Sequence, residues 1–155
     1  VGYNLEGNEL GAAFGLAQLK KLNNNIKIRE KNFKIQHEYF SKHSSFFSNP
    51  IQTPNTRTGW LAYPILIKQK ANFSRKEFQI FLEKRNIQTR VVFTGNILRQ
   101  PMMKGLEFKS NNIGYPNSDA VMERGVLLPI HHGMTDNMFN RLHDVIDEFL
   151  LSKNN

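Results

Sequence analysis

The sequence predicts an α+β fold: a long N-terminal helical segment, then a small two-layer α/β sandwich whose short, mainly antiparallel sheet has helices on one face. Three observations predict it. Helical periodicity runs through most of the first 43 residues, three short apolar runs alternate with amphipathic segments after residue 60, and 12 Phe among 155 residues can supply a packed core. We therefore expect two parts, residues 1–45 and residues 46–155.

The first predicted helix covers residues 8–22, with Asn8 as its N-terminal cap. Its apolar residues recur at i, i+3, i+4 and i+7, as Leu10, Ala13, Phe14 and Ala17. The triplet Asn23–Asn25 is a weak helix former and predicts a kink or a short break, after which the pattern resumes to about His43. At about 1.5 Å per residue this region would be roughly 50 Å long. We expect part of it to pack on something outside this chain.

The polar connector Ser44–Thr58 leads to the first predicted strand, Trp60–Ile67, in which Pro64 indicates an edge position or a bulge. The capping-box sequence Ser74–Glu77 then opens a helix. That helix carries the apolar residues Phe78, Phe81 and Leu82. A second strand is expected at residues 88–93, where Val91, Val92 and Phe93 would join the sheet core.

The remaining chain is predicted to form a short helix, a short buried strand and a long helix. Asn117 or Ser118 can cap the short helix, which runs through Arg124, and Gly125–Pro129 has the pattern of the strand. Thr135 can cap the last helix. The apolar face of that helix would consist of Met138, Leu142, Val145, Ile146 and Phe149.

Composition excludes several classes of protein. The chain has no Cys, which excludes disulfides, thiolate metal sites and cysteine nucleophiles within it, and it has no apolar run long enough to span a bilayer. These features are compatible with a cytoplasmic protein. The net charge of +8 would suit phosphate-bearing partners. Its excess lies largely in Lys20–Lys42, which we interpret as the polar face of a helix, so a nucleic-acid partner is the less favoured reading.

The sequence shows no metal-ligating or nucleophile motif. Adjacent residues of an extended chain point to opposite sides, so His131 and His132 would not bind one metal together. One of them could serve a site, or both could belong to an ordinary polar turn. Arg90 fits an outward residue of a half-buried strand. Arg99 follows a Gly-Asn turn, where backbone amides and a guanidinium can converge on an anion.

Four ordered segments resemble the vitamin B6-dependent sugar-aminotransferase superfamily. They are Gly2-Tyr3-Asn4-Leu5 with the GLAQL run at 15–19, WLAYPI at 60–65, T-R-x-x-F-x-G-N-x-x-R-Q-P at 89–101, and Asn117-Ser118-Asp119 with PIHHGMT at 129–135. The segment at 89–101 resembles more narrowly the nucleotide-sugar 3-dehydratases of lipopolysaccharide and deoxysugar biosynthesis.

This resemblance implies the C-terminal small domain of a fold-type-I enzyme that uses pyridoxal or pyridoxamine phosphate (PLP or PMP). Residues 1–45 would link it to a large domain upstream of Val1, which would carry the catalytic Lys or, in the dehydratase branch, His. We therefore expect no catalytic residue, no metal ligand and no tightly bound cofactor in this chain alone. The complete enzyme would be a homodimer that acts on a nucleotide-diphosphate ketosugar, without a membrane partner.

The resemblance also implies site residues. Asn4 would reach the cofactor phosphate, although it could instead turn or cap the entry to the first helix. Phe93, Asn96, Arg99, Gln100 and His132 would contribute to the wall of the sugar-nucleotide pocket, and the alternative for Arg99 is an interdomain salt bridge. The chain departs from the family pattern at Glu6, where relatives carry a basic residue, and at Asn8, Glu9 and Gly11.

The function that we expect is therefore the small-domain part of a nucleotide-sugar 3-dehydratase. A 4-aminotransferase of the same family is the first alternative. Alternatives from other classes are a stand-alone basic nucleotide- or nucleic-acid-binding module and a structural subunit that completes a dimer.

Overall fold

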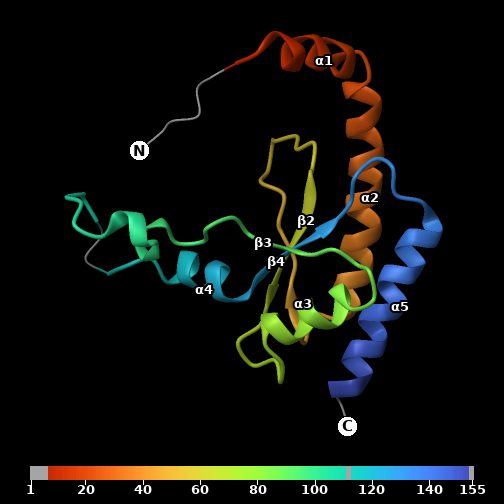
Figure 1. Cartoon of the computed structure of the whole chain (residues 1–155). Coiled ribbons are helices and arrows are strands. Elements are labelled where there is room, and N and C mark those ends of the chain that lie inside the picture. Colours follow the sequence, from red (N-terminus) through yellow and green to blue (C-terminus); the bar gives the residue numbers. More distant parts are fainter. Residues whose placement is uncertain (1–6, 111–112, 154–155) are drawn as a thin grey trace.

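The computed structural model describes residues 7–110 and 113–153 as five α-helices, two short 3-10 helices and one sheet of four strands (Figure 1). This is the α+β fold that the sequence predicts. The elements in chain order are α1 (Glu9–Leu19), α2 (Leu22–Lys42), β1 (Phe47–Ser48), β2 (Ala62–Ile67), α3 (Arg75–Glu83), β3 (Arg90–Val91), η1 (Ile97–Arg99), η2 (Pro101–Met103), α4 (Pro116–Arg124), β4 (Gly125–Pro129) and α5 (Asp136–Lys153). No helix among these residues is long and apolar enough to cross a membrane.

The sheet has the strand order β1-β2-β4-β3, and all three pairings are antiparallel. The long pairing joins β2 to β4, from Ala62 opposite Pro129 to Leu66 opposite Gly125. Leu127 of β4 is paired on one side with Pro64 and on the other with Arg90. Directly paired residues of antiparallel strands point to the same face, so these three side chains share one face of the sheet.

The opposite face of the sheet is the core face, and α2, α3 and α5 supply the side chains that cover it. Along β2 and β4 buried residues alternate with less buried ones, as expected for a sheet with one face covered. Aromatic rings dominate this core, and Phe78 of α3 and Phe149 of α5 lie edge to face with centroids 5.3 Å apart. Its largest fully buried residues include Phe40, Phe47, Tyr63, Ile67, Leu82, Leu128, Ile130, Leu142 and Ile146.

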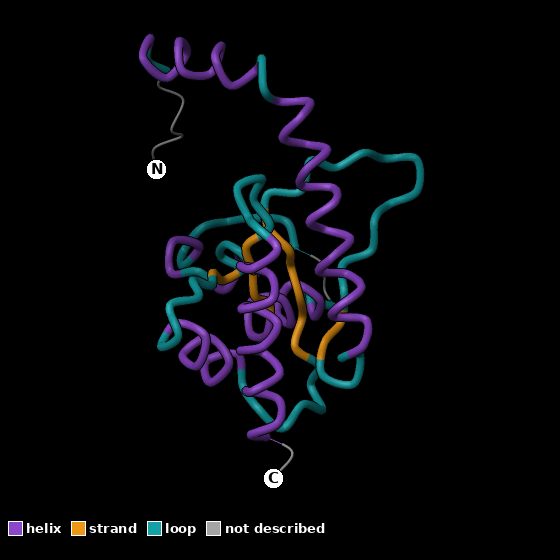
Figure 2. Tube along the Cα trace, turned by 90° about the vertical axis from the view of Figure 1, so that its right-hand side faces the viewer, coloured by secondary structure: helices purple, strands orange, loops and turns teal. Residues whose placement is uncertain are grey.

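The N-terminal helical region bends at Lys20–Lys21 instead of at Asn23–Asn25. Asn23 and Asn24 lie in the first turn of α2, where backbone amides have no acceptor within the helix, so weak helix formers are tolerated there. The Asn25 amide already donates to the carbonyl oxygen of Lys21, at 3.0 Å. Asn8 caps α1 as predicted, because its Oδ1 accepts from the Gly11 amide at 2.7 Å. No residue of α1 is buried, and the helix stands away from the sheet in both ribbon views (Figures 1 and 2).

One prediction about the strands is corrected and one is confirmed. The strand expected at 88–93 contains only Arg90 and Val91. Val91 and Phe93 do not join the core, since they are 43% and 85% exposed. The reason is that β3 is an edge strand and Phe93 adopts a φ of 48°, which turns the chain away from the sheet. The edge position expected for Pro64 is confirmed. β2 has neighbours on both sides in the strand order, but β1 pairs only with Leu66 and Ile67, so Pro64 has a strand on one side only.

Two helix details also differ from prediction. The short helix α4 begins at Pro116, with proline in the first turn, so Asn117 and Ser118 lie inside the helix and do not cap it. In α5, Thr135 caps as expected, since its Oγ1 accepts from the Met138 amide at 3.4 Å. Phe139 is buried in place of Met138, which is 51% exposed. The capping box at Ser74 and Glu77 forms as predicted.

Candidate functional site

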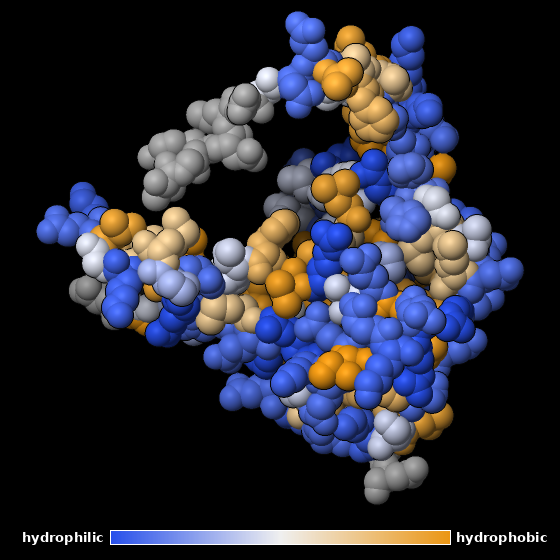
Figure 3. Space-filling view, viewed as in Figure 1, coloured by the Kyte–Doolittle hydropathy of each residue, from blue (hydrophilic) through white to orange (hydrophobic). Residues whose placement is uncertain are grey.

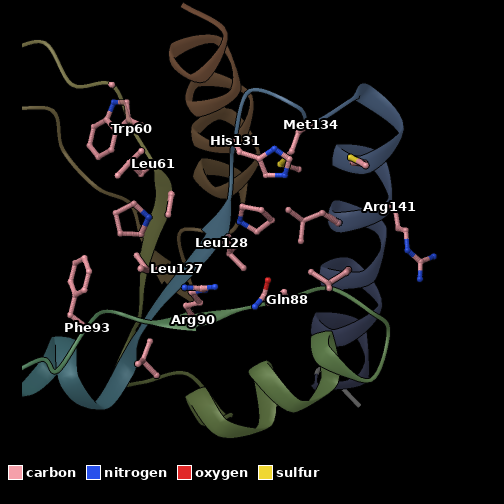
Figure 4. Close-up of a pocket in the computed structure, with 18 of the residues that line it drawn as sticks. Trp60, Leu61, Gln88, Arg90, Phe93, Leu127, Leu128, His131, Met134 and Arg141 are labelled. Atoms are coloured by element: carbon pink, nitrogen blue, oxygen red, sulfur yellow. The ribbon is translucent and has the colours of Figure 1, made fainter. Parts of the chain in front are cut away.

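The open face of the sheet bears an apolar pocket with a volume of about 1290 Å³ (Figure 4). Residues from the connector before β2, from β2, β3 and β4, and from α5 surround it. In the space-filling view, apolar surface gathers at the centre of the face that Figure 1 presents (Figure 3). A concave, mainly apolar surface with a few polar groups is the usual form of a small-molecule site.

The sheet pleat builds the floor of this pocket. Ala62 and Pro64 of β2 face the same way as Leu127 and Pro129 of β4, because they are directly paired residues. All four line the pocket, whereas the alternate residues of both strands are buried in the core; among these, Leu128 also borders the pocket. A sheet that buries one face therefore leaves an apolar floor on the other, and no polar side chain of β2 or β4 interrupts it.

Two aromatic side chains flank the pocket. Trp60 lies just before β2 and stacks on Phe33 of α2, with centroids 4.1 Å apart and an angle of 15° between the rings. Phe93 lies beyond the end of β3 and lines the same pocket, below Trp60 in the view of Figure 4. Its positive φ is uncommon for a bulky residue and places an exposed ring at the pocket instead of in the core.

Arg90 supplies a positive charge at the floor. Its partner Leu127 lines the pocket, and the Arg90 side chain reaches the same space (Figure 4). The backbone of Arg90 pairs with β4, but its guanidinium makes no hydrogen bond and no ion pair with any residue in the described part of the chain. The second arginine of the lining, Arg141, differs because its Nη2 donates to the Arg85 carbonyl oxygen at 2.8 Å.

The structure separates the two adjacent histidines. His131 lines the pocket, and its Nδ1 accepts a hydrogen bond from the Gly133 amide at 3.2 Å. The neutral ring then carries its proton on Nε2, where it can donate to a ligand. His132 is exposed and is not among the residues that line the pocket.

Arg99 forms an ion pair with Asp119 of α4. Its Nε donates to Oδ1 at 3.0 Å and its Nη2 donates to Oδ2 at 2.9 Å. The Arg99 guanidinium, followed by the Asn96 amide, lowers the pKa of the Asp119 carboxyl to about 2. The alternative for Arg99 was an interdomain salt bridge; the observed pair lies within the predicted small domain, residues 46–155, and so differs from that alternative.

The other two polar residues of the predicted loop also bind protein groups. Asn96 is buried, donates to Asp119 Oδ1 at 2.8 Å and accepts from the Leu98 amide at 3.0 Å. Gln100 donates to the Thr94 carbonyl oxygen at 2.8 Å. These contacts hold residues 94–100 against α4, and Phe93 is the member of the predicted set that lines the pocket. Asn4 lies outside the described residues.

The sequence predicted no site role for two residues that the fold brings to the pocket, Trp60 and Arg90; for the histidine pair it left a site role open and named His132, whereas His131 is the one that lines the pocket. Trp60, Arg90 and His131 all stand inside segments that carry the family resemblance, so their position was a signal. The sequence does not predict which face of β3 is left uncovered by helices. The position of Arg90 at a pocket was therefore not predicted.

The pocket does not by itself fit a B6 cofactor. PLP requires a group at the Schiff-base position and a partner for its pyridine nitrogen, commonly an aspartate. The described residues that line the pocket include no lysine and no carboxylate. The described residues also contain no group of three or more His, Cys, Asp or Glu that could hold a metal ion. What the arrangement offers is an apolar surface, the two aromatic side chains and two guanidinium cations, of which Arg90 has no side-chain partner in the described chain.

Comparison with known proteins gives consistent matches. The model of the DegT/DnrJ/EryC1/StrS aminotransferase family matches residues 1–147. A dTDP-4-dehydro-2,6-dideoxy-D-glucose 3-dehydratase of Saccharopolyspora spinosa is 34% identical over 150 residues, which are 97% of this chain and 32% of that protein. The lipopolysaccharide biosynthesis protein RfbH of Salmonella typhimurium is 29% identical over 150 residues, 96% of this chain and 34% of that protein.

A solved structure, that of Escherichia coli GDP-4-keto-6-deoxy-D-mannose-3-dehydratase with bound hydrated PLP, superposes with a TM-score of 0.80 at 26% identity. The match covers 93% of this chain and 36% of that one. The chain thus spans about a third of the length of the proteins that it matches.

Proposed function

Because the chain belongs to the DegT/DnrJ/EryC1/StrS aminotransferase family, we propose that it is the C-terminal part of a B6-dependent nucleotide-sugar 3-dehydratase. The matched relatives named as 3-dehydratases support this proposal, and so does the backbone similarity to a PLP-bound 3-dehydratase. In the complete enzyme, PLP or PMP would supply the electron sink for loss of the C3 hydroxyl. The Lys or His at the Schiff-base position would come from an upstream large domain.

In this proposal the chain contributes the small-domain wall of the substrate pocket. The observation that carries it is Arg90, a guanidinium without a protein partner in the described chain, at the floor of an apolar pocket. A cation beside low-dielectric walls favours an anionic ligand, and guanidinium binds phosphate oxygens with two parallel hydrogen bonds. The ligand that fits is a nucleotide-diphosphate ketosugar.

The other predicted residues keep defined places in the proposal. Phe93 would contact the substrate directly, and Asn96, Arg99 and Gln100 would shape the loop that carries it. A direct contact of Arg99 with substrate remains a prediction and requires its ion pair with Asp119 to open. The roles of Asn4 at the cofactor phosphate, of His132 at the substrate and of a homodimer in the complete enzyme are likewise predictions.

The alternative is a 4-aminotransferase with the same fold, which the aminotransferase name of the matching family favours. The two reactions leave different products. A 3-dehydratase removes the C3 hydroxyl, whereas a 4-aminotransferase places an amine at C4 and consumes an amino donor.

The test is to incubate the complete polypeptide with B6 cofactor, glutamate and 4-keto-6-deoxyhexoses linked to CDP, GDP or dTDP, and to identify the product by mass spectrometry. We expect a 3-deoxy sugar from one of the three nucleotides. An amino sugar that keeps its C3 hydroxyl would establish the alternative and overturn the dehydratase proposal. Sequencing upstream of Val1 gives an independent check, because a His at the Schiff-base position agrees with the proposal and a Lys contradicts it.

A further inference from the structure

The backbone that leads from β4 to His131 is held in place by hydrogen bonds from side chains of another element. Pairing between β2 and β4 ends at Ala62 opposite Pro129, and the next residue, Ile130, is fully buried. Buried backbone carbonyl groups beyond the end of the strand pairing still require hydrogen-bond donors, because an unpaired buried carbonyl costs free energy. The strand itself supplies none for Pro129, Ile130 and His131 after this point.

Two amide side chains of α2 supply these donors. Asn32 Nδ2 donates to the His131 carbonyl oxygen at 2.9 Å and to the Ile130 carbonyl oxygen at 3.3 Å. Gln36 Nε2 lies 3.5 Å from the Pro129 carbonyl oxygen. Residues four apart on a helix share one face, so Gln36 and Asn32 meet successive carbonyl groups of the chain as it leaves β4. Asn32 and Gln36 are 3% and 0% exposed, and such deeply buried polar residues are normally found with partners.

The restraint extends to the imidazole ring. The His131 carbonyl also accepts from the Met134 amide at 3.1 Å, and this turn places the Gly133 amide on His131 Nδ1. Gln36 is fixed in turn, because its Oε1 lies 2.9 Å from Nε2 of His143 on α5. The backbone at 130–131 is therefore held from α2, while the His131 ring lies at the pocket.

We propose that Asn32 is a positioning residue for ligand binding: it fixes the backbone at Ile130 and His131 so that His131 offers its Nε2 proton to an oxygen of the bound sugar nucleotide. This inference rests on the proposed function of the pocket. Asn32 itself contacts neither the pocket nor the ligand; it acts through the turn that orders the imidazole.

The first experiment uses the 155-residue chain without ligand. In Asn32→Leu, which has a similar size but no donor, we expect His131 to lose its preference for the Nε2-protonated tautomer in long-range ¹H–¹⁵N spectra. We also expect the Gly133 amide to exchange with solvent at least about tenfold faster. Asn24→Leu, at an exposed asparagine of the same helix, is the matched control and should change neither quantity. Unchanged tautomer and exchange in a folded Asn32→Leu chain would overturn the proposal.

If Asn32→Leu does not fold, Asn32→Ala carries the same test. The second experiment measures KM and kcat of the complete enzyme. Asn32→Leu should raise KM for the nucleotide sugar about tenfold, with a smaller change in kcat, and Asn24→Leu should match the parent. If Asn32→Leu disorders the His131 ring but leaves KM unchanged, Asn32 does order His131, and the pocket is rejected as the substrate site. Failure of the positioning role and failure of the proposed function therefore give different results.

Discussion

Asp119 accepts two parallel hydrogen bonds from Arg99, Nε to Oδ1 at 3.0 Å and Nη2 to Oδ2 at 2.9 Å, and thereby joins the loop after β3 to α4. The loop that most resembles a 3-dehydratase segment is therefore held by an internal carboxylate.

This pair predicts a pH dependence. The pKa of Asp119 is lowered to about 2 by Arg99 and then by Asn96, so its contribution to stability is present above its ordinary pKa near 4 and is lost as the pH falls toward 2. In Arg99→Ala we expect the pKa of Asp119 to rise toward its ordinary value, which ¹³C carboxyl shifts in a pH titration would measure. Arg57→Ala, which breaks a different pair, with Glu30, should leave it unchanged. An Asp119 pKa that stays near 2 in Arg99→Ala would contradict this.

Arg90 provides the second prediction. Arg90→Ala in the complete enzyme should raise KM for the nucleotide sugar by about 10- to 100-fold, since a hydrogen bond to a charged group contributes roughly 1.5–3 kcal/mol. Arg90→Lys should recover part of this loss, because it restores the charge without the planar fork. Steady-state kinetics with Arg57→Ala as the control would decide, and an unchanged KM in Arg90→Ala would remove the residue from the site.

Gly95 provides the third prediction. Its φ is +65°, and a Cβ placed there would lie 2.2 Å from the Cβ of Met122. Gly95→Ala should therefore lower the free energy of unfolding by about 2–4 kcal/mol, through backbone strain and overpacking. Gly105 also has a positive φ, of +81°, but has no atom within 4 Å of such a Cβ. Gly105→Ala should cost only about 1–2 kcal/mol. Urea unfolding measures both, and equal losses would argue against the contact with Met122.

Phe93 provides the fourth prediction, in which stability rises. Its φ of 48° costs roughly 1–2 kcal/mol for a bulky residue, and Asn tolerates this conformation better, as Asn55 and Asn86 illustrate in this chain. Phe93→Asn should raise the free energy of unfolding of the 155-residue chain by about 1 kcal/mol. Phe93→Ala removes the ring but keeps the strain and is the control. If Phe93→Asn is no more stable than Phe93→Ala, the strain is not stored at this residue.

His143 provides the fifth prediction. Burial lowers its pKa from 6.5 to about 4, against the opposing effect of Asp147 and Asp144. The unfolded chain therefore binds a proton at a higher pH than the folded chain, so stability should fall as the pH drops from about 6.5 to about 4 and should show no further loss from this group below that. His143→Gln should flatten this window in urea melts at successive pH values. A variant whose stability falls as steeply as that of the parent would contradict the assignment.

Local sequence patterns predicted most elements of this fold because their causes are local. The Asn8 cap, the capping box of Ser74 and Glu77 and the Thr135 cap are each set by contacts within four residues. The helix break was placed at Asn23–Asn25 instead of at Lys20–Lys21, because propensity ranks the asparagines as poor helix formers but does not show that the first turn tolerates them.

The candidate site was less predictable, because its members are brought together by sheet register. From sequence, Arg90 is predicted to be an ordinary outward residue of a strand. In the structure β3 pairs with β4, and this pairing places Arg90 beside Leu127 at the apolar floor of the pocket. His131 and His132 could not be distinguished by type or spacing, and the turn at Gly133 decides which of them lines the pocket.

The sequence by itself determined the fold class, the family and the order of the α-helices and of β2, β3 and β4, because hydrophobic periodicity, caps and family segments are properties of short stretches of chain. It did not predict β1, which lies in the expected connector Ser44–Thr58. The tertiary structure alone decided which charges are available to a ligand. Arg99 and Arg90 are equivalent as side chains, but α4 brings Asp119 to the first, and the described chain offers no such partner to the second. Whether an arginine is paired depends on residues distant in sequence, which only the packed structure places beside it.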